Sequence, residues 1–374
     1  MVYLDYASTT PVSYEAMDVY TKIAKEYFCL PYGNNKLEEK SKDYLKRIKK
    51  TIADNFNVMD SELEFTSGAI EANNLALIGT MLANHKEGNH LIVSKLEHKS
   101  VYKICNYLEK LGFEIDYVDN DTDGLIDFDN LRSLIRKDTV LVSICALNSE
   151  TGVRQPLKMI RQIIKKENQS TLLHSDMASA VGKIAINLHD VDLASISSHK
   201  IFGPKGIGLL YRSEKVKITP LMVGDDKALS PCTNSVAQIA AFSVALSQAI
   251  NDLEKKEHFV SRLNDKITTE LKDLDNITFN KTNYCVPYIL SMTLKKMDAS
   301  LFLKRLNEKD IIINATHGEI NPSILAVFKD KERAKDVLRI SLSYKTTTEE
   351  VNKFIKEFKS IYKDISLGGE WWKK

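Results

Sequence analysis

The chain has 374 residues, of which 43% are hydrophobic and 27% are charged, and its formal net charge at pH 7 is +2. These proportions are those of a soluble globular protein long enough for two domains, and the nearly balanced charge gives no reason to expect nucleic acid or a membrane as a partner. No stretch approaches the roughly 20 consecutive apolar residues that a membrane-spanning helix needs.

The cysteines are scattered along the chain without any CxxC pair: they are Cys29, Cys105, Cys145, Cys232 and Cys285. This spacing indicates neither a disulfide framework nor a zinc site, so no metal is expected. The first residues, MVYLD, lack the basic and apolar regions of a secretory signal. We therefore expect a cytoplasmic protein.

Short apolar runs alternate with amphipathic stretches along most of the chain. An early stretch dense in Lys and Glu, residues 37–56, predicts an exposed amphipathic helix. The following runs predict strands at 90–93, 114–118, 139–146, 171–174, 193–197 and 207–211, with helices at 99–111, 128–136 and 157–166. Near-continuous apolar strands separated by helices indicate an α/β fold with a parallel or mixed sheet covered on both faces.

A second, smaller unit follows. A long helical stretch at 236–262 connects it to the sheet, and it mixes predicted strands (288–294 and 337–342) with predicted helices (299–306 and 349–362). This mixture indicates an α+β domain. No internal repeat, low-complexity tract or long linker interrupts the chain.

The segment Ser197-Ser198-His199-Lys200 ends one predicted strand and leads into a turn of sequence GPKG. A lysine held at a strand end among closely packed backbone loses part of its hydration, which lowers its pKa and frees its amine for Schiff-base chemistry. The alternative for an isolated lysine is a surface turn without chemistry.

Asp176 ends the preceding predicted strand, at the edge where α/β sheets bind ligands. An acid there, one strand away from a Schiff-base lysine, suits the protonated ring nitrogen of pyridoxal phosphate. Alone, Asp176 also fits a helix N-cap. It is therefore the pair of Asp176 and Lys200 that points to this cofactor.

With this pair, the chain resembles the class V aminotransferase-fold enzymes and, within that group, is most similar to the cysteine desulfurases. The resemblance runs nearly from end to end and rests on further segments in matching order: LDYASTTP at 4–11, TSGAIEANN at 66–74, EHKSV at 97–101, NSETG at 148–152 and VLRIS at 337–341. It implies the aspartate aminotransferase-like fold of pyridoxal phosphate-dependent transferases. The large α/β domain would span 12–258, and 1–11 with 259–374 would form the small α+β domain.

The same resemblance implies partners and residue roles. The protein would be a homodimer that acts on cysteine or a related amino acid and passes sulfur to an acceptor protein. Lys200 and His98 would be catalytic, with Lys200 as the Schiff-base lysine and base at Cα, and His98 stacked on the ring. Cofactor contacts would come from Ala69, Ile70, His98, Asp176, Ser179, Ser197, His199, Lys200 and Thr233, the last in the partner's site. The substrate would be held by Asn148, Ser149 and Arg339, whose planar guanidinium suits a carboxylate.

Each motif taken singly has a plainer interpretation. The turn at 66–74 fits an ordinary strand-to-helix turn, His98 fits a capping histidine, and Arg339 fits an ion-paired arginine inside a strand. The order and spacing of all the motifs together favour the family.

The chain also departs from the family pattern. Ile70 stands where a hydroxyl residue usually contacts the phosphate, and Ser149 stands where an Asn precedes the loop Glu. Ser179 replaces an expected Gln, and Ser230 replaces an expected Arg. We expect weaker phosphate binding and a weaker hydrogen bond to the phenolic oxygen of the cofactor.

The largest departure is in the loop before Arg339, which carries the sulfur-accepting cysteine in the family. Here residues 314–323 read NATHGEINPS, and no cysteine occurs from 286 to 374. Without a thiolate, the persulfide step of desulfuration cannot run on this loop. Cys232 is the cysteine that the resemblance places near a neighbouring active site, and a buried inert thiol is its favoured interpretation.

Three hypotheses follow. The favoured one is a pyridoxal phosphate-dependent enzyme acting on an amino acid, diverged from the desulfurases toward elimination, transamination or another reaction at Cα. The second is desulfuration with Cys232 in place of the loop cysteine. The third is a non-catalytic or cofactor-poor relative that binds a partner protein.

Overall fold

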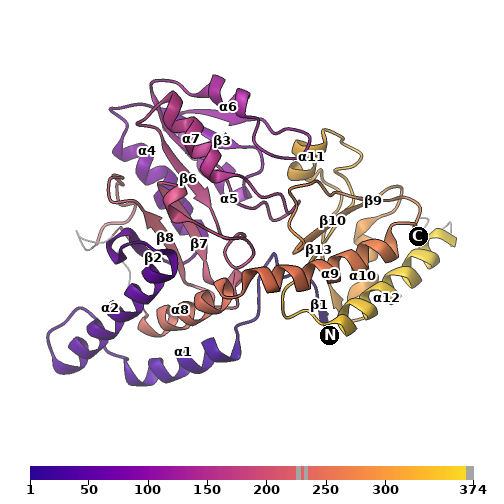
Figure 1. Ribbon diagram of the computed structural model, residues 1–374, viewed down its shortest axis with the longest axis horizontal. Coiled ribbons are helices and arrows are strands. Elements are labelled where there is room, and N and C mark those ends of the chain that lie inside the picture. Colours follow the sequence, from indigo (N-terminus) through magenta and orange to yellow (C-terminus); the bar gives the residue numbers. More distant parts are fainter. Residues whose placement is uncertain (225–228, 231–234, 368–374) are drawn as a thin grey trace.

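The structure is a computed structural model that describes residues 1–224, 229–230 and 235–367. Figure 1 shows a large sheet with helices on both of its faces and, beside it, a smaller group of strands and helices. The helices α8 (Val236–Ile250) and α9 (Leu253–Leu271) run one after the other from the first group to the second. No helix in the described ranges has the length and apolar character required to cross a membrane.

Within the described residues, the large sheet has seven strands, in the order β2 (Leu63–Thr66), β8 (Gly208–Arg212), β7 (Leu193–Ser197), β6 (Leu172–Asp176), β5 (Thr139–Ser143), β3 (His90–Ser94) and β4 (Glu114–Val118). All pairs from β7 to β4 are parallel, whereas β8 runs antiparallel to both of its neighbours. Parallel strands bring their carboxyl ends to one edge of the sheet, which is the edge where such sheets bind ligands.

Alternate residues of these strands pack into two different hydrophobic clusters. Leu91 and Val93 belong to the cluster that contains side chains of α3 (Ala69–Asn74), α4 (Thr80–Ala83) and α5 (Lys99–Lys110). Ile92 belongs to the other cluster, with side chains of α6 (Phe128–Leu134), α7 (Leu157–Glu167) and α8. The period of two residues in a strand therefore explains why both faces of the sheet are apolar and covered.

Two further helices lie against α8: these are α1 (Tyr14–Glu26) and α2 (Lys36–Phe56). Helix α2 begins with a capping box, in which the Asn35 side chain accepts from the backbone of Leu37 and Glu38 and the Glu38 carboxylate accepts from the Asn35 backbone. This reciprocal pair satisfies amide groups that a helix start leaves open.

The smaller group contains an antiparallel sheet in the order β12 (Asn314–Thr316), β13 (Val337–Ser341), β10 (Ile289–Leu294) and β9 (Ile277–Phe279), together with α10 (Ala299–Asn307), α11 (Pro322–Phe328) and α12 (Thr348–Leu367). The first strand of the chain, β1 (Val2–Tyr3), pairs in parallel with β11 (Ile311–Ile312). Asp5 forms a parallel bridge with Ser341. The N-terminal residues therefore lie beside the strand that carries Arg339.

The predicted α/β architecture is confirmed, and the predicted strands and helices lie close to the observed ones. Two predictions need correction. The single helix predicted at 236–262 is two helices, interrupted at Asn251 and Asp252. Asp252 has a φ of 52°, in the left-handed region that Asn and Asp enter more readily than most residues. The strand predicted at 139–146 also ends earlier, at Ser143.

Candidate active site

The carboxyl ends of β6 and β7 bring Asp176 and Lys200 to the same edge of the large sheet. Asp176 is the last residue of β6 and pairs in register with Ser195 of β7. Strand β7 ends at Ser197, and a 3-10 turn over Ser198–Lys200 follows directly. Asp176 and Lys200, which were predicted to act as a pair, therefore lie at the ends of neighbouring parallel strands.

The surroundings of Lys200 destabilise the charged form of its amine. Burial lowers the pKa of Lys200, the charges of Asp176 and Glu150 oppose this change, and the charge of Arg339 adds to it. The amine donates a hydrogen bond to Ser179 Oγ at 3.1 Å. An amine that gives up its proton easily is what the predicted Schiff-base chemistry requires.

The carboxylate of Asp176 is held by two donors. Its Oδ1 accepts from the backbone N–H of Ala178 at 2.9 Å, and its Oδ2 accepts from the side-chain amide of Asn73 at 2.8 Å. Hydrogen bonds to the ionised form stabilise a buried carboxylate. Asn73 was not among the predicted site residues, and the one sign of it in the sequence is its place in the segment 66–74.

His98 caps α5 from the loop after β3. Its Nδ1 accepts from the backbone N–H of Ser100 at 3.2 Å and lies 2.8 Å from Ser100 Oγ. Burial and the charge of Lys200 lower the pKa of His98, whereas Asp176 raises it. Because Nδ1 accepts, the proton of the neutral ring is on Nε2, which is therefore the nitrogen that can donate.

The turn between β2 and α3 presents backbone amides. Gly68 has a φ of +152°, which favours glycine, and α3 begins at Ala69 without a side-chain cap. Ile70 is 62% exposed. A Cβ on Gly208 of β8 would come within 2.6 Å of Gly68 Cα, so glycine at 208 is needed for this close approach. The predicted phosphate turn thus offers main-chain N–H groups.

The other residues that were predicted to bind the phosphate do not belong to the turn between β2 and α3. Ser197 is buried at the end of β7. His199 is directed to the N-terminal segment, where its Nδ1 lies 3.0 Å from Thr9 Oγ1. Burial, together with the charge of Lys200, lowers the pKa of His199 to about 4. Thr233 and Cys232 lie outside the described residues.

Arg339 is buried in β13 and has protein partners on both arms of its guanidinium. Its Nη2 lies 2.9 Å from Asp5 Oδ1 and 2.6 Å from Ser8 Oγ. Its Nη1 contacts the Glu150 carboxylate and, at 3.3 Å, the backbone carbonyl of Ser149. Two carboxylates therefore share the arginine that was predicted to bind the substrate.

Asn148 and Ser149 shape the loop that carries Glu150. The amide nitrogen of Asn148 donates to Leu96 O at 2.8 Å and to Ser323 Oγ at 3.0 Å. Its Oδ1 accepts from the backbone of Glu150 at 2.9 Å. The buried side chain of Asn148 thus holds the loop in place, and Ser149 contributes its carbonyl to Arg339.

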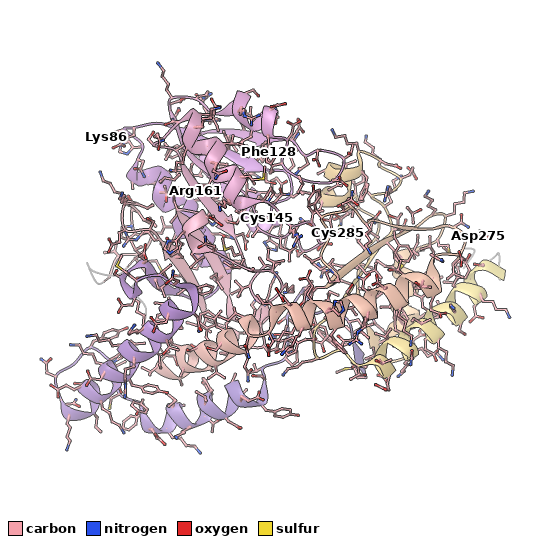
Figure 2. All side chains as sticks on the ribbon, viewed as in Figure 1. Lys86, Phe128, Cys145, Arg161, Asp275 and Cys285 are labelled. Carbon is pink, nitrogen blue, oxygen red and sulfur yellow. The ribbon has the colours of Figure 1, made fainter. Side chains whose placement is uncertain are left out.

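The segment 314–323, which lacks the family cysteine, is fixed to the same loop. The side-chain amide of Asn321 donates to Glu150 Oε2 at 3.2 Å and to Thr316 Oγ1 at 3.1 Å. Cys285 contacts the loop from another side, because its Sγ donates to Thr151 O at 3.2 Å. Figure 2 shows Cys285 between the large sheet and the smaller group of strands.

The fold and the matches along the chain define the class of protein. The chain belongs to the class-V aminotransferase family, which matches residues 2–354. Enzymes of this family generally use pyridoxal phosphate. The family interpretation made from the sequence motifs is therefore confirmed.

Within the family, the chain is similar to cysteine desulfurases. Cysteine desulfurase IscS of Dictyoglomus turgidum is 32% identical over 364 residues, covering 94% of this chain and 92% of the relative. IscS of Buchnera aphidicola subsp. Schizaphis graminum is 33% identical over 394 residues, covering 99% and 95%. The chain is thus a cysteine desulfurase-like member of the family.

Solved structures show the same similarity in three dimensions. A NifS-like protein superposes with a TM-score of 0.92 at 29% identity, covering 98% of this chain and 99% of that chain. A structure described as SspA in complex with cysteine has a TM-score of 0.78 at 28% identity, covering 93% of this chain and 100% of that chain.

Proposed function

We propose that this protein binds pyridoxal phosphate and acts on cysteine or a closely related amino acid. The observation that carries the proposal is the convergence of Lys200 and Asp176 at the carboxyl edge of the sheet. The first residue offers an amine of lowered pKa, and the second offers a carboxylate held by Asn73 and Ala178. The cysteine desulfurase relatives support cysteine as the substrate.

The residues present fit this cofactor. Lys200 would bind its aldehyde, Asp176 its ring nitrogen and His98 its ring face. The uncapped start of α3 at Ala69 and Ile70 would bind its phosphate, together with Ser197, His199 and Thr233. When bound, pyridoxal phosphate supplies an aldehyde that condenses with amines and a ring that withdraws electrons from the substrate Cα.

The protein's own groups would then position the substrate and move its protons. Lys200 would take the proton from Cα, because burial already disfavours its ammonium form. Ser179 would orient the amine through the hydrogen bond to its Oγ. Arg339 would orient the substrate carboxylate, which must then share the guanidinium with Asp5 and Glu150.

The reaction would differ from that of a desulfurase with a thiol on the loop at 314–323. One outcome is transfer of sulfur from cysteine to an external thiol, which yields alanine and a persulfide. The other is elimination, in which cysteine and water yield pyruvate, ammonia and sulfide. We propose that neither route passes sulfur through residues 314–323, because this segment has no cysteine.

The remaining parts of the proposal concern assembly. We propose a homodimer in which Thr233 reaches the partner's cofactor, a protein that accepts sulfur, and a cytoplasmic location. Residues 12–258 would form the large domain, and 1–11 with 259–374 the small one. Large apolar side chains that are exposed on one chain support a dimer: Tyr14, Met17, Phe28 and Leu30. Light scattering should then give twice the chain mass of 42.3 kDa.

An absorption titration tests cofactor binding. Purified protein mixed with pyridoxal phosphate should develop the visible band of lysine-bound cofactor. Lys200→Ala should lose this band, whereas Lys205→Ala, which changes an exposed lysine in the next turn, should keep it. If the wild-type protein develops no band, the protein is a cofactor-free relative and the proposal is wrong.

Product analysis tests the reaction. With cysteine and an added thiol, alanine identifies desulfuration, and pyruvate with ammonia identifies elimination. Cys232→Ala should leave the product and its rate unchanged. Loss of alanine formation in this variant would instead identify Cys232 as the sulfur acceptor.

A further inference from the structure

A small cavity lies beside Lys200, on the side of the C-terminal strands. Its volume is ≈ 20 Å³, and its walls include Lys183, Lys200 and Tyr288. Apolar parts of the wall come from Val181, Ile201 and Leu342. A cavity of this size has room for one water-sized occupant.

Lys183 brings an amine without a counter-charge to this cavity. The residue is 8% exposed, and the described part of the chain gives its amine neither a hydrogen bond nor an ion pair. Burial and the charge of Lys200 lower the pKa of Lys183 to about 7. No Asp or Glu side chain occurs among the described residues that line the cavity. The ammonium form of Lys183 thus lacks a counter-charge, and an anion in the cavity would stabilise it.

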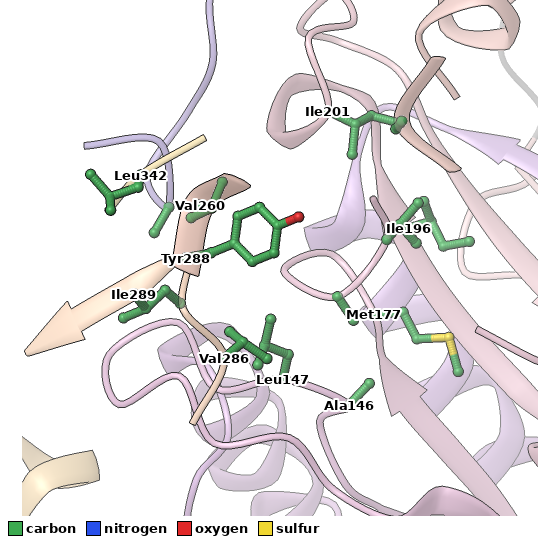
Figure 3. Close-up of a cluster of buried hydrophobic side chains, with 14 of the residues drawn as sticks. Ala146, Leu147, Met177, Ile196, Ile201, Val260, Val286, Tyr288, Ile289 and Leu342 are labelled. Atoms are coloured by element: carbon green, nitrogen blue, oxygen red, sulfur yellow. The ribbon is translucent and has the colours of Figure 1, made fainter. Parts of the chain in front are cut away.

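Tyr288 supplies a second donor. It is 2% exposed, and its hydroxyl has no hydrogen-bond partner among the described residues. Figure 3 shows the ring reaching from the segment before β10 toward the large sheet, with the hydroxyl oxygen on the side of Ile201. A buried hydroxyl without an acceptor is costly, so an acceptor in the cavity would stabilise the fold.

We propose that this cavity is a binding site for one monovalent anion of halide size, such as chloride, held by the amine of Lys183 and the hydroxyl of Tyr288. Both groups can donate, so the ligand must accept. A negative ligand also offsets the positive charge of the Lys183 ammonium group, which a water molecule cannot do. The small volume of the cavity fits a halide better than sulfate or phosphate. This site is distinct from the substrate arginine and adds to the proposed function.

Thermal unfolding of the cofactor-free protein tests the site. At constant ionic strength, replacing gluconate by chloride or bromide should raise the melting temperature, because a ligand that binds the native state stabilises it. Lys183→Met, which keeps the length and the apolar stem, should abolish the halide-dependent shift. Tyr288→Phe should reduce it. The matched control is Lys158→Met on α7, where the lysine is exposed, and it should keep the full shift.

Crystals grown in bromide give an independent test through anomalous scattering. The proposal requires an anomalous peak between Lys183 Nζ and Tyr288 Oη, and its absence in Lys183→Met. A cavity that contains only water in bromide would overturn it. Equal stabilisation by halide in wild type and Lys183→Met would also overturn it, because the anion would then bind elsewhere.

Discussion

Asp5 lies 2.9 Å from Arg339 Nη2, although the two residues are separated by 334 positions in the chain. The side chains of both residues are mostly buried, at 12% and 6% exposure. Glu150 contacts the other arm of the same guanidinium. One arginine thus joins the first segment of the chain, the loop at 148–152 and strand β13.

The first prediction concerns the stability that depends on this arginine. Arg339→Met leaves the Asp5 and Glu150 carboxylates without their counter-charge, and should lower the free energy of unfolding by about 3 kcal/mol. Urea denaturation measures the loss. Arg132→Met is the control, because Arg132 pairs with Asp129 at the surface. It should cost less than about 1 kcal/mol, and equal losses would contradict the account.

The second prediction concerns substrate binding. A substrate carboxylate must compete with Glu150 for Arg339, so Glu150→Gln should lower the KM for the amino acid by about threefold to tenfold, the effect expected of one charged contact. Steady-state kinetics with cysteine measure this change. Glu332→Gln, at an exposed ion pair, should leave the KM unchanged. An unchanged KM in Glu150→Gln would show that the carboxylate of the substrate does not bind at Arg339.

The third prediction concerns Asn73, whose amide donates to Asp176. Asn73→Asp removes the amide donor and places a second negative charge beside Asp176, so that cofactor affinity should fall by about tenfold or more. Fluorescence titration with pyridoxal phosphate measures the affinity. Asn74→Ala is the matched control one residue further, because Asn74 donates only to Ile70 O among the described contacts. It should bind the cofactor normally.

Much of this arrangement could be predicted from residue patterns. Apolar strands and their order along the chain predict the large sheet, and the ends of two strands predict the pairing of Asp176 with Lys200. The partners of Arg339 could not be predicted in this way. They come from segments 334 and 189 residues away, and the contact of Asp5 depends on the N-terminal segment lying beside β13.

Other features could not be predicted because the local sequence pattern does not reveal them. In the sequence, Asn73 looks like any other polar residue of a helix. The spacing of apolar residues does not show which polar side chain reaches a neighbouring strand. Lys183 reads as a surface lysine until the fold buries it. The break between α8 and α9 depends on a left-handed Asp252, and this residue type tolerates that conformation but does not require it.

The fourth prediction is a loss of stability in mild acid. His174 is buried between Ser143 and Ser195, and burial lowers its pKa to about 4. An unfolded histidine titrates near 6.5, so between about pH 6.5 and 4 only the unfolded chain binds the proton. Stability is therefore highest above pH 6.5 and falls as the pH decreases.

Urea denaturation at pH 7.5 and pH 5 measures this effect. The contribution of His174 over that range is roughly 2 kcal/mol from the difference between the two pKa values. His174→Gln should make the two stabilities more similar than they are in the wild type. His85→Gln, at an exposed histidine, should not, and a wild-type stability independent of pH would contradict the assignment.

Lys200 is the residue that we propose to bind the cofactor. The most direct test is borohydride reduction of the protein after incubation with pyridoxal phosphate, followed by mass spectrometry of its peptides. A single stoichiometric cofactor adduct on Lys200 is expected. An adduct on Lys183, the other amine of the same cavity, or no stable adduct at all, would contradict it.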